Sequence, residues 1–170
     1  CRNLEIKFLT VYAFSLENFN RDKNELEPLM DLFEESFRNA ADDPQIHKNK
    51  VRIRSIGHRE LLPERVVKAI EYAENKTKDY DLYNYNLAVA YGGRQEIVRS
   101  MTKIAEKIEK GKLSSSDINA DLISDNLYTS NLPDPDLILR TSGEERISNF
   151  LLWQLAYSEL YFADVFWPEM

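Results

Sequence analysis

The chain has 170 residues, with 22 lysines and arginines against 29 aspartates and glutamates, which gives a formal net charge of −7. Its 43% hydrophobic and 30% charged residues exclude a disordered or fibrous chain. The acidic balance argues against a nucleic-acid partner but allows a small anionic ligand, and no apolar run approaches the length of a membrane span.

Segments with strand and helix patterns alternate in the first half of the chain. Residues Ile6–Phe14 are β-rich and almost continuously apolar, which predicts a strand covered on both faces. A helix is expected from about Asn24 to Ala41, because apolar residues recur there at helical spacing. The alternating segment Val51–Gly57 predicts a strand nearer a sheet edge, and Pro63 opens a helix that continues through Thr77.

The same alternation continues in the second half. Its predicted elements are a strand at Tyr85–Tyr91, a helix over Ile97–Ile108, a shorter helix over Ser116–Leu127, a short buried strand at Asp136–Arg140, an aromatic-rich helix near Asn149–Tyr157 and a last strand near Glu159–Phe162. This order predicts a single α/β domain with a mostly parallel sheet flanked by helices. Ligands of such sheets bind beyond the carboxyl ends of the strands, which selects Phe14–Arg21, Tyr91–Arg94 and Arg140–Ser148.

Common catalytic signatures are missing from the sequence. There is no dinucleotide fingerprint, no phosphate-binding Walker sequence and no nucleophile elbow. The two histidines, His47 and His58, lie in charged segments and are expected to be exposed and inert. The absence of a Cys/His cluster excludes a structural zinc site.

Arginines at strand ends are a candidate binding signal. Arg140 ends a predicted strand, with Arg146 and Ser148 shortly after it, and Arg21 follows the first strand after a short polar loop. Guanidinium groups bind phosphate through paired hydrogen bonds, and a serine hydroxyl adds a donor, so these residues could neutralise a diphosphate. The alternative is ordinary ion pairing with the many nearby glutamates.

Two further polar features have both a structural and a functional interpretation. The cluster of Ser15, Glu17 and Asn18 after the first strand is either part of a site or a turn with a helix cap. Glu159 lies among aromatic and apolar residues, so its carboxylate should be paired, hydrogen-bonded or bound to a metal. Mg²⁺ is typically held by one or two carboxylates with phosphate oxygens, but a structural ion pair is the simpler alternative.

Three segments together resemble the cis-prenyltransferase family, which includes undecaprenyl and dehydrodolichyl diphosphate synthases. They are VYAFSLENFNR at Val11–Arg21, AYGGR at Ala90–Arg94 and DLILRTSGEERISNFLLWQLAYSELYFADVFWP at Asp136–Pro168. The resemblance extends over essentially the whole chain. It implies a parallel sheet flanked by helices, with an apolar tunnel for the growing chain and a homodimeric assembly.

The resemblance also implies a reaction. Members condense isopentenyl diphosphate with an allylic prenyl diphosphate, such as farnesyl or geranylgeranyl diphosphate, with Mg²⁺ as cofactor. The product is a Z-polyprenyl diphosphate, the precursor of a glycosyl carrier lipid. Leu29, Met30, Phe33 and Phe37 could line the tunnel, although a core position is their default interpretation.

The resemblance also implies which residues form the site, because the functional residues of the family match positions in these motifs. Asn18 matches the catalytic residue, which we expect to orient the substrate rather than act as the base, and Glu159 matches the Mg²⁺ ligand. The expected substrate-binding residues are Ser15, Leu16, Glu17, Phe19, Arg21, Arg140, Glu144, Arg146, Ile147 and Ser148. Within this set, Glu144 is expected to orient Arg140 or Arg146.

The chain departs from the family at both ends. The family's amino-terminal phosphate loop and its basic carboxyl-terminal tail are absent from the 170 residues. The prediction is therefore a cis-prenyltransferase domain over 1–170 that lacks both parts and is inactive alone. The alternatives are a non-catalytic prenyl-diphosphate-binding protein and a partner subunit of a heteromeric synthase.

The expected location follows from the cysteine content and the product. The only cysteine, Cys1, cannot form an internal disulfide, which suits a reducing compartment. We therefore expect a cytoplasmic protein, with possible peripheral membrane association through the lipid product.

Overall fold

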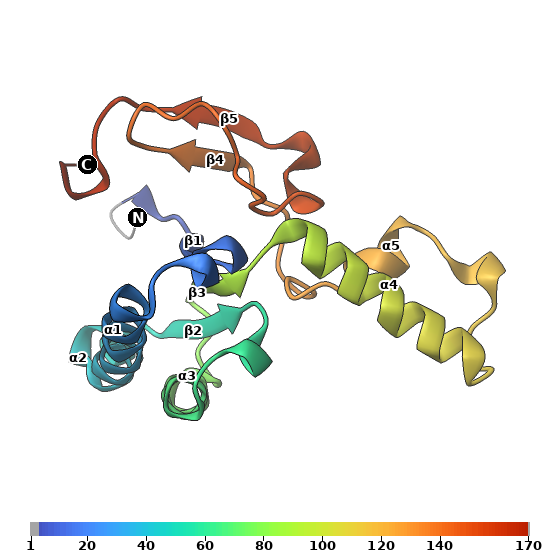
Figure 1. The fold of residues 1–170 in the computed structure, drawn as a ribbon, viewed down its shortest axis with the longest axis horizontal. Helices are drawn as coiled ribbons and strands as arrows, with labels where there is room; N and C mark the ends of the chain where they lie inside the picture. Colours follow the sequence, from blue (N-terminus) through green and yellow to red (C-terminus); the bar gives the residue numbers. More distant parts are fainter. Residues whose placement is uncertain (1–3, 170) are drawn as a thin grey trace. The chain divides into compact units, whose positions relative to one another are not determined.

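The computed structural model describes residues 4–169, so Cys1 lies outside the described part (Figure 1). The described residues divide into two compact units that meet in sequence at Tyr91 and Gly92. We call them the first unit and the second unit. The prediction that residues 1–170 form a single domain stays a prediction.

A three-stranded parallel sheet forms the centre of the first unit. Its strands are β1 (Phe8–Ser15), β2 (Val51–Ile56) and β3 (Tyr83–Tyr91), in the order β1-β3-β2. The helices of this unit are α1 (Lys23–Asp42), α2 (Pro44–Lys48) and α3 (Glu64–Thr77). Each pair of successive strands is joined through helices, as parallel strands require. The predicted α/β class with a parallel sheet is confirmed.

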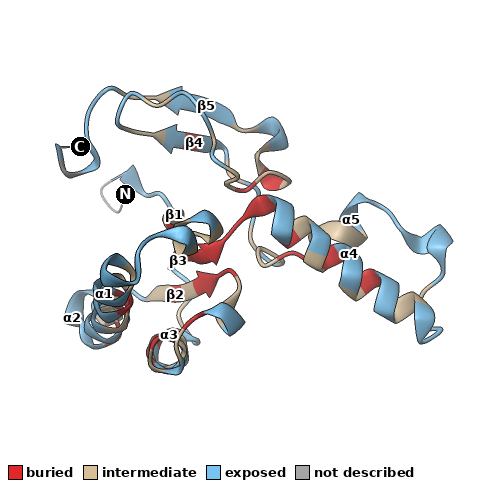
Figure 2. Ribbon diagram, viewed as in Figure 1, coloured by how far each residue is buried: buried red, intermediate tan, exposed pale blue. Residues whose placement is uncertain are grey.

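Helices α1 and α3 pack against each other and bury one apolar face each (Figure 2). On α1 the buried residues are Met30, Phe33, Phe37 and Ala41, which share one core cluster with α3 and the strands. The structure thus places three of the four predicted tunnel residues in the core, with Leu29 packed against it. The predicted tunnel itself stays a prediction.

Strand β1 is less covered than predicted. Only Phe14 among its residues is buried, and Phe8 is 43% exposed. The prediction of a strand covered on both faces was wrong, since the residues of β1 other than Phe8 and Phe14 are only half-buried. As an edge strand, β1 also has a neighbouring strand on one flank only.

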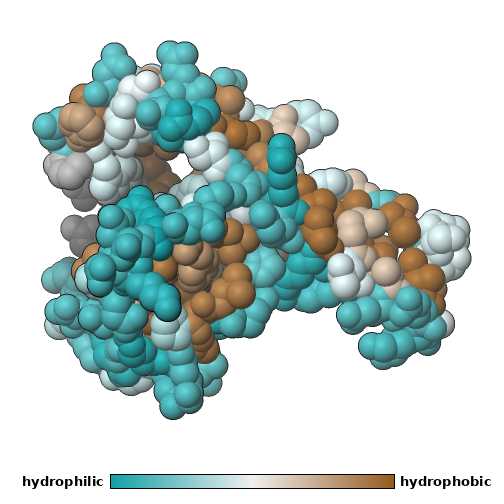
Figure 3. All heavy atoms as spheres, viewed as in Figure 1, coloured by the Kyte–Doolittle hydropathy of each residue, from teal (hydrophilic) through white to brown (hydrophobic). Residues whose placement is uncertain are grey.

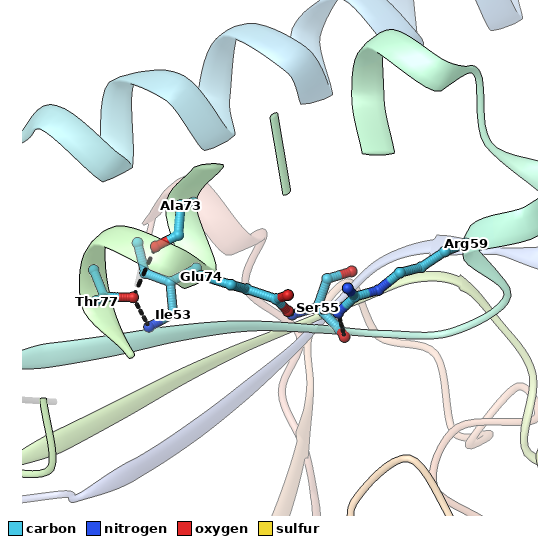
Figure 4. Close-up of polar contacts among 6 residues, drawn as sticks. All are labelled: Ile53, Ser55, Arg59, Ala73, Glu74 and Thr77. Atoms are coloured by element: carbon cyan, nitrogen blue, oxygen red, sulfur yellow. Dashed lines mark hydrogen bonds and ion pairs between the residues drawn. The ribbon is translucent and has the colours of Figure 1, made fainter. Parts of the chain in front are cut away.

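The opposite edge strand, β2, is closed by side chains of α3 (Figure 4). The Ile53 amide donates a hydrogen bond to Thr77 Oγ1 over 3.0 Å, and the Ser55 amide donates one to Glu74 Oε1 over 2.8 Å. Arg59 donates to the same carboxylate oxygen and to the Ser55 carbonyl. These outward amides would otherwise be available to another strand, so α3 ends the sheet at β2.

The second unit contains α4 (Gly93–Glu109), α5 (Ala120–Ser124), β4 (Leu137–Arg140) and β5 (Glu159–Phe162). Strands β4 and β5 pair in parallel as a two-stranded sheet. The strand that was predicted to be buried, β4, is only partly buried, because Ile138 is buried while Leu137 is 55% exposed. The alternation along β4 indicates that one face of this sheet is packed and the other is exposed.

Two predicted helices of the second unit are wrong in detail. The helix expected over Ser116–Leu127 is a short 3₁₀ helix at Ser115–Asp117 followed by the single turn of α5. The aromatic-rich helix expected near Asn149–Tyr157 is mostly turns, with a 3₁₀ helix only at Gln154–Tyr157. Positive φ angles at Asn149 and Leu151 interrupt a right-handed helix there.

The two histidines are not exposed as predicted. His47 lies between Tyr80 and the end of α1, with Nδ1 2.9 Å from the Tyr80 hydroxyl and Nε2 2.8 Å from the Ala41 carbonyl. His58 is half-buried beside Glu60. Short helix α2, which carries His47, was not predicted. Across residues 4–169 no helix has both the length and the apolar character needed to cross a bilayer.

Candidate functional site

A capped polar turn follows β1. Ser15 ends the strand opposite Tyr91 of β3, and a 3₁₀ helix covers Leu16–Asn20. Asn18 Oδ1 accepts hydrogen bonds from the Ser15 amide over 2.9 Å and from the Ser15 hydroxyl over 3.1 Å. Because a backbone amide can only donate, the accepting atom of Asn18 must be its oxygen. The structure therefore contains the turn with a helix cap. In this turn the Asn18 amino group remains as the donor that could contact a ligand.

The other predicted residues of this turn differ in environment. Leu16 and Phe19 pack against the core, and the Phe19 ring lies 5.0 Å from that of Phe14. Glu17 is exposed. Arg21 is also exposed and lies 3.7 Å from Glu25, an ion pair of the kind that contributes about 0–1 kcal/mol. Such a weak pair leaves Arg21 able to exchange Glu25 for a phosphate group.

Tyr12 ties the ends of β1 and β3 together and was not singled out from the sequence. Its hydroxyl donates to the Tyr91 carbonyl over 3.1 Å, and the two rings meet edge to face. Burial, with a smaller contribution from Glu17, raises the pKa of Tyr12 to about 12. Tyr12 therefore remains a hydrogen-bond donor at neutral pH and fixes the strand end from which the polar turn departs.

Residues 140–148 of the second unit form a loop that we call the arginine loop. Arg140, half-buried at the end of β4, donates from Nη1 to Ser148 Oγ over 2.7 Å and to the Arg146 carbonyl. Arg146 is exposed and paired with Glu144, which agrees with the expected orienting contact. Ile147, which lies between Arg146 and Ser148 in the chain, is half-buried. The structure thus brings five predicted substrate-binding residues into one loop.

The backbone of this loop and of the next residues is held in unusual conformations. Positive φ angles occur at Ser142, Gly143, Ser148, Asn149 and Leu151. For residues other than glycine this conformation costs about 1 kcal/mol each. Such strain persists where surrounding contacts fix the backbone, and it concentrates at functional segments.

Glu159 opens β5 with an exposed side chain. Its amide donates to the Asp136 carbonyl over 2.9 Å, while its carboxylate forms no ion pair or hydrogen bond with any residue of 4–169. The structural ion pair considered from the sequence therefore has no partner in the described chain. No cluster of three or more acidic, histidine or cysteine side chains occurs among these residues. A lone exposed carboxylate fits Mg²⁺, which completes its coordination with water and phosphate oxygens.

Comparison with known proteins identifies the family of the chain. The family model described as putative undecaprenyl diphosphate synthase matches residues 1–170. The chain belongs to the undecaprenyl diphosphate synthase family. The resemblance to cis-prenyltransferases seen in the sequence is thereby confirmed.

Curated members of the undecaprenyl diphosphate synthase family are similar over nearly the whole chain. A geranylgeranyl-diphosphate-specific tritrans,polycis-undecaprenyl-diphosphate synthase of Methanocaldococcus jannaschii is 56% identical over 98% of this chain. The synthase of the same name from Thermococcus kodakarensis is 51% identical over 99% of it. The chain covers 60% and 64% of these two relatives, so it spans about three fifths of their length.

Solved structures show the same family fold. Lavandulyl diphosphate synthase from Lavandula x intermedia, in complex with dimethylallyl diphosphate, matches with a TM-score of 0.90 and 38% identity, over 99% of this chain and 72% of the other. A probable undecaprenyl diphosphate synthase from Campylobacter jejuni matches with a TM-score of 0.86 and 37% identity, over 100% of this chain and 76% of the other.

Proposed function

We propose that the protein containing this chain condenses isopentenyl diphosphate with an allylic prenyl diphosphate to form a Z-polyprenyl diphosphate, the precursor of a glycosyl carrier lipid. The arginine loop is the observation that carries this proposal, because it presents Arg140, Arg146 and Ser148 on a fixed backbone. The names of the archaeal relatives support geranylgeranyl diphosphate as the allylic substrate, with farnesyl diphosphate as the alternative.

The reaction separates charge at the allylic substrate. Breaking the bond to its diphosphate leaves a carbocation and a negatively charged leaving group. Arginines fixed before the reaction stabilise diphosphate charge without further reorganisation. Arg21 would serve the allylic diphosphate, and Arg140 with Arg146 and Ser148 would bind the diphosphate of isopentenyl diphosphate. The reaction requires that the carbon–carbon bond form before water reacts with the cation.

Asn18 contributes a donor in this scheme. Its Oδ1 already accepts two hydrogen bonds from Ser15, and a neutral amide is a very weak proton acceptor. The Asn18 amino group would therefore orient a diphosphate oxygen, and the released diphosphate would take the proton lost from the new isoprene unit.

Glu159 is the residue that would hold Mg²⁺. Bound there with phosphate oxygens, the ion would supply Lewis-acid assistance to the departure of diphosphate. The family resemblance and the exposed Glu159 carboxylate, which has no ion-pair partner among residues 4–169, support the proposal that the reaction depends on Mg²⁺.

Replacing Asn18 with aspartate should separate its donor role from its capping role. Aspartate keeps the oxygen that accepts from Ser15 but has no amino group, so we expect an unchanged melting temperature and a roughly 100-fold lower kcat/KM. This loss corresponds to about 3 kcal/mol, as for a hydrogen bond to a charged group. Steady-state assays of the full-length protein measure it, with Asn18→Ala as a comparison that also loses the cap. Retained or increased activity in the aspartate variant would refute the donor role of the Asn18 amino group.

Replacing Glu159 with glutamine should change metal dependence without changing stability. The side chain is exposed and unpaired within the described residues, so we expect the same melting temperature as the parent. The Mg²⁺ concentration that gives half-maximal rate should rise at least about tenfold, because one anionic ligand is lost. Glu35→Gln on α1 is a matched control, because Glu35 is also exposed and forms no ion pair or side-chain hydrogen bond with any residue of 4–169. An unaltered Mg²⁺ titration in Glu159→Gln would refute the metal role.

One experiment tests the proposed function as a whole. The full-length protein is incubated with labelled isopentenyl diphosphate, geranylgeranyl diphosphate or farnesyl diphosphate, and Mg²⁺, and the lipid is extracted. We expect label in the organic phase. Binding of isopentenyl diphosphate without any labelled lipid would favour a non-catalytic binding protein or a partner subunit over the synthase.

Partners and location extend the proposal. Val98 and Met101 of α4 are among the exposed apolar side chains of the described residues. Hydrophobic residues are visible on the face of the molecule drawn in Figure 3. Such surface would suit an assembly such as a homodimer. We also propose a cytoplasmic protein that meets the membrane peripherally through its lipid product. Light scattering and vesicle flotation of the full-length protein measure these two properties.

A further inference from the structure

Helix α4 begins without a capping side chain of its own. Its N-cap residue is Gly92, and the first helical residue is Gly93. The first amides of a helix have no partner inside the helix and need acceptors from elsewhere. A helix of 17 residues that starts at two glycines therefore depends on another part of the chain.

Asn149, which lies 55 residues beyond Arg94, supplies acceptors to two of these amides. Its carbonyl accepts from the Gly93 amide over 2.7 Å, and its Oδ1 accepts from the Arg94 amide over 2.9 Å. Its amino group donates to Gln95 Oε1 over 3.1 Å. One residue thus contacts three successive positions at the start of α4.

The packing at this point is tight enough to fix the position of Asn149. A Cβ atom at Gly93 would lie 2.8 Å from Leu152 Cγ, 3.0 Å from the Leu152 amide nitrogen and 3.1 Å from the Asn149 carbonyl oxygen. Asn149 itself has a φ of 63°, a conformation that asparagine tolerates better than most residues. The backbone after the arginine loop is therefore held directly against the helix.

Asn149 also follows Ser148, the residue that accepts from Arg140. The helix start, Asn149, Ser148 and Arg140 form one continuous chain of contacts. Because Asn149 occupies the Gly93 and Arg94 amides, these groups are not available to a phosphate. Recognition of a diphosphate in this segment then falls to the arginine side chains.

We infer that Asn149 is a positioning residue for isopentenyl diphosphate: it fastens the arginine loop to the start of α4, so that Arg140 and Ser148 are held in the arrangement that binds the diphosphate. This inference rests on the proposed function of the arginine loop. Asn149 touches no reacting atom and acts through Ser148 and Arg140.

The test compares full-length wild type with Asn149→Gly, which keeps the positive φ but removes the side-chain cap. We expect the Kd for isopentenyl diphosphate, measured by titration calorimetry, and its KM to rise about tenfold. The kcat should change by less than about threefold, because the reacting groups remain. Hydrogen exchange at the Arg94 amide should become faster, which verifies that the cap has been lost.

A second variant separates positioning from simple helix capping. In Asn149→Gly, the further change Gly92→Ser gives α4 its own cap, since the nearest obstacles to a Cβ at Gly92 are the Asn149 amino group and the flexible end of Gln95. We expect this double variant to recover the melting temperature but not the Kd. Recovery of both would overturn the inference and leave Asn149 a helix cap only.

The outcomes also distinguish this inference from the proposed function. A wild-type Kd in Asn149→Gly despite a deprotected Arg94 amide overturns the positioning role while the synthase activity stands. Wild type that binds isopentenyl diphosphate but makes no lipid overturns the synthase, and the raised Kd of the variant still supports positioning. Wild type that does not bind isopentenyl diphosphate overturns both.

Discussion

Arg140→Ala is expected to reduce kcat/KM for isopentenyl diphosphate at least about 100-fold in the full-length protein. The change removes a positive charge and the two hydrogen bonds that Arg140 donates within the arginine loop, to Ser148 Oγ and to the Arg146 carbonyl. Truncating a charged hydrogen-bonded group in a binding site typically costs about 2–5 kcal/mol, and 1.4 kcal/mol corresponds to a factor of ten. Steady-state kinetics with isopentenyl diphosphate varied at saturating allylic substrate measure the effect.

Two further variants make this result interpretable. Arg140→Lys keeps the charge but cannot form paired, planar hydrogen bonds, so we expect an intermediate loss. Arg38→Ala removes an arginine whose ion pair with Glu34 lies on the surface of α1, and it should leave the kinetics unchanged. Near-normal activity in Arg140→Ala would show that diphosphate binding does not depend on the arginine loop.

Gly57→Ala is expected to destabilise the protein by about 4 kcal/mol or more, so that little folded protein accumulates. Gly57 follows β2 with a φ of 135°, which side chains rarely adopt. An added Cβ would lie 1.9 Å from the Val89 carbonyl oxygen, inside a buried backbone of β3. Neither backbone can move freely, because the His58 amide donates to the Ala90 carbonyl over 2.9 Å. Soluble yield and urea unfolding measure the loss.

Gly111→Ala is the matched control for this substitution. Gly111 follows α4 with a φ of 66°, but apart from its two chain neighbours no residue of 4–169 comes within 4 Å of the position of its Cβ. Only the conformational cost of about 1 kcal/mol should therefore appear. Similar urea midpoints for the two variants would show that the contact with β3 does not determine the requirement for glycine at position 57.

The fold class could be predicted because the hydrophobic pattern of each helix and strand depends only on residues close together in the sequence. Apolar spacing located α1 and α3, and alternation located β2, which the structure confirms. The prediction failed where a few backbone angles decide the outcome. Asn149 and Leu151 carry no strong helix-breaking signal in their residue types, yet their positive φ angles end the expected helix.

The candidate site was predicted in part. Arg140, Arg146 and Ser148 were found because they follow one another closely in sequence and match a family motif, and the structure brings them into one loop. Tyr12 and Asn149 were not found, because their partners lie 79 and 55 residues away. Gly92 and Gly93, which offer the start of α4 no capping side chain, were a signal in the sequence that another residue must complete the helix.

The closed edge of β2 has a consequence for the fate of the chain while it folds. Exposed strand edges recruit other chains and start aggregation. Here the outward amides of Ile53 and Ser55 donate to Thr77 and Glu74 of α3. The edge of β2 is therefore protected from other strands only after α3 has packed against it. A chain whose α3 is delayed or melted would expose this edge during heating or synthesis. Helix α3 thus prevents β2 from pairing with a strand of another chain, in addition to contributing to the core.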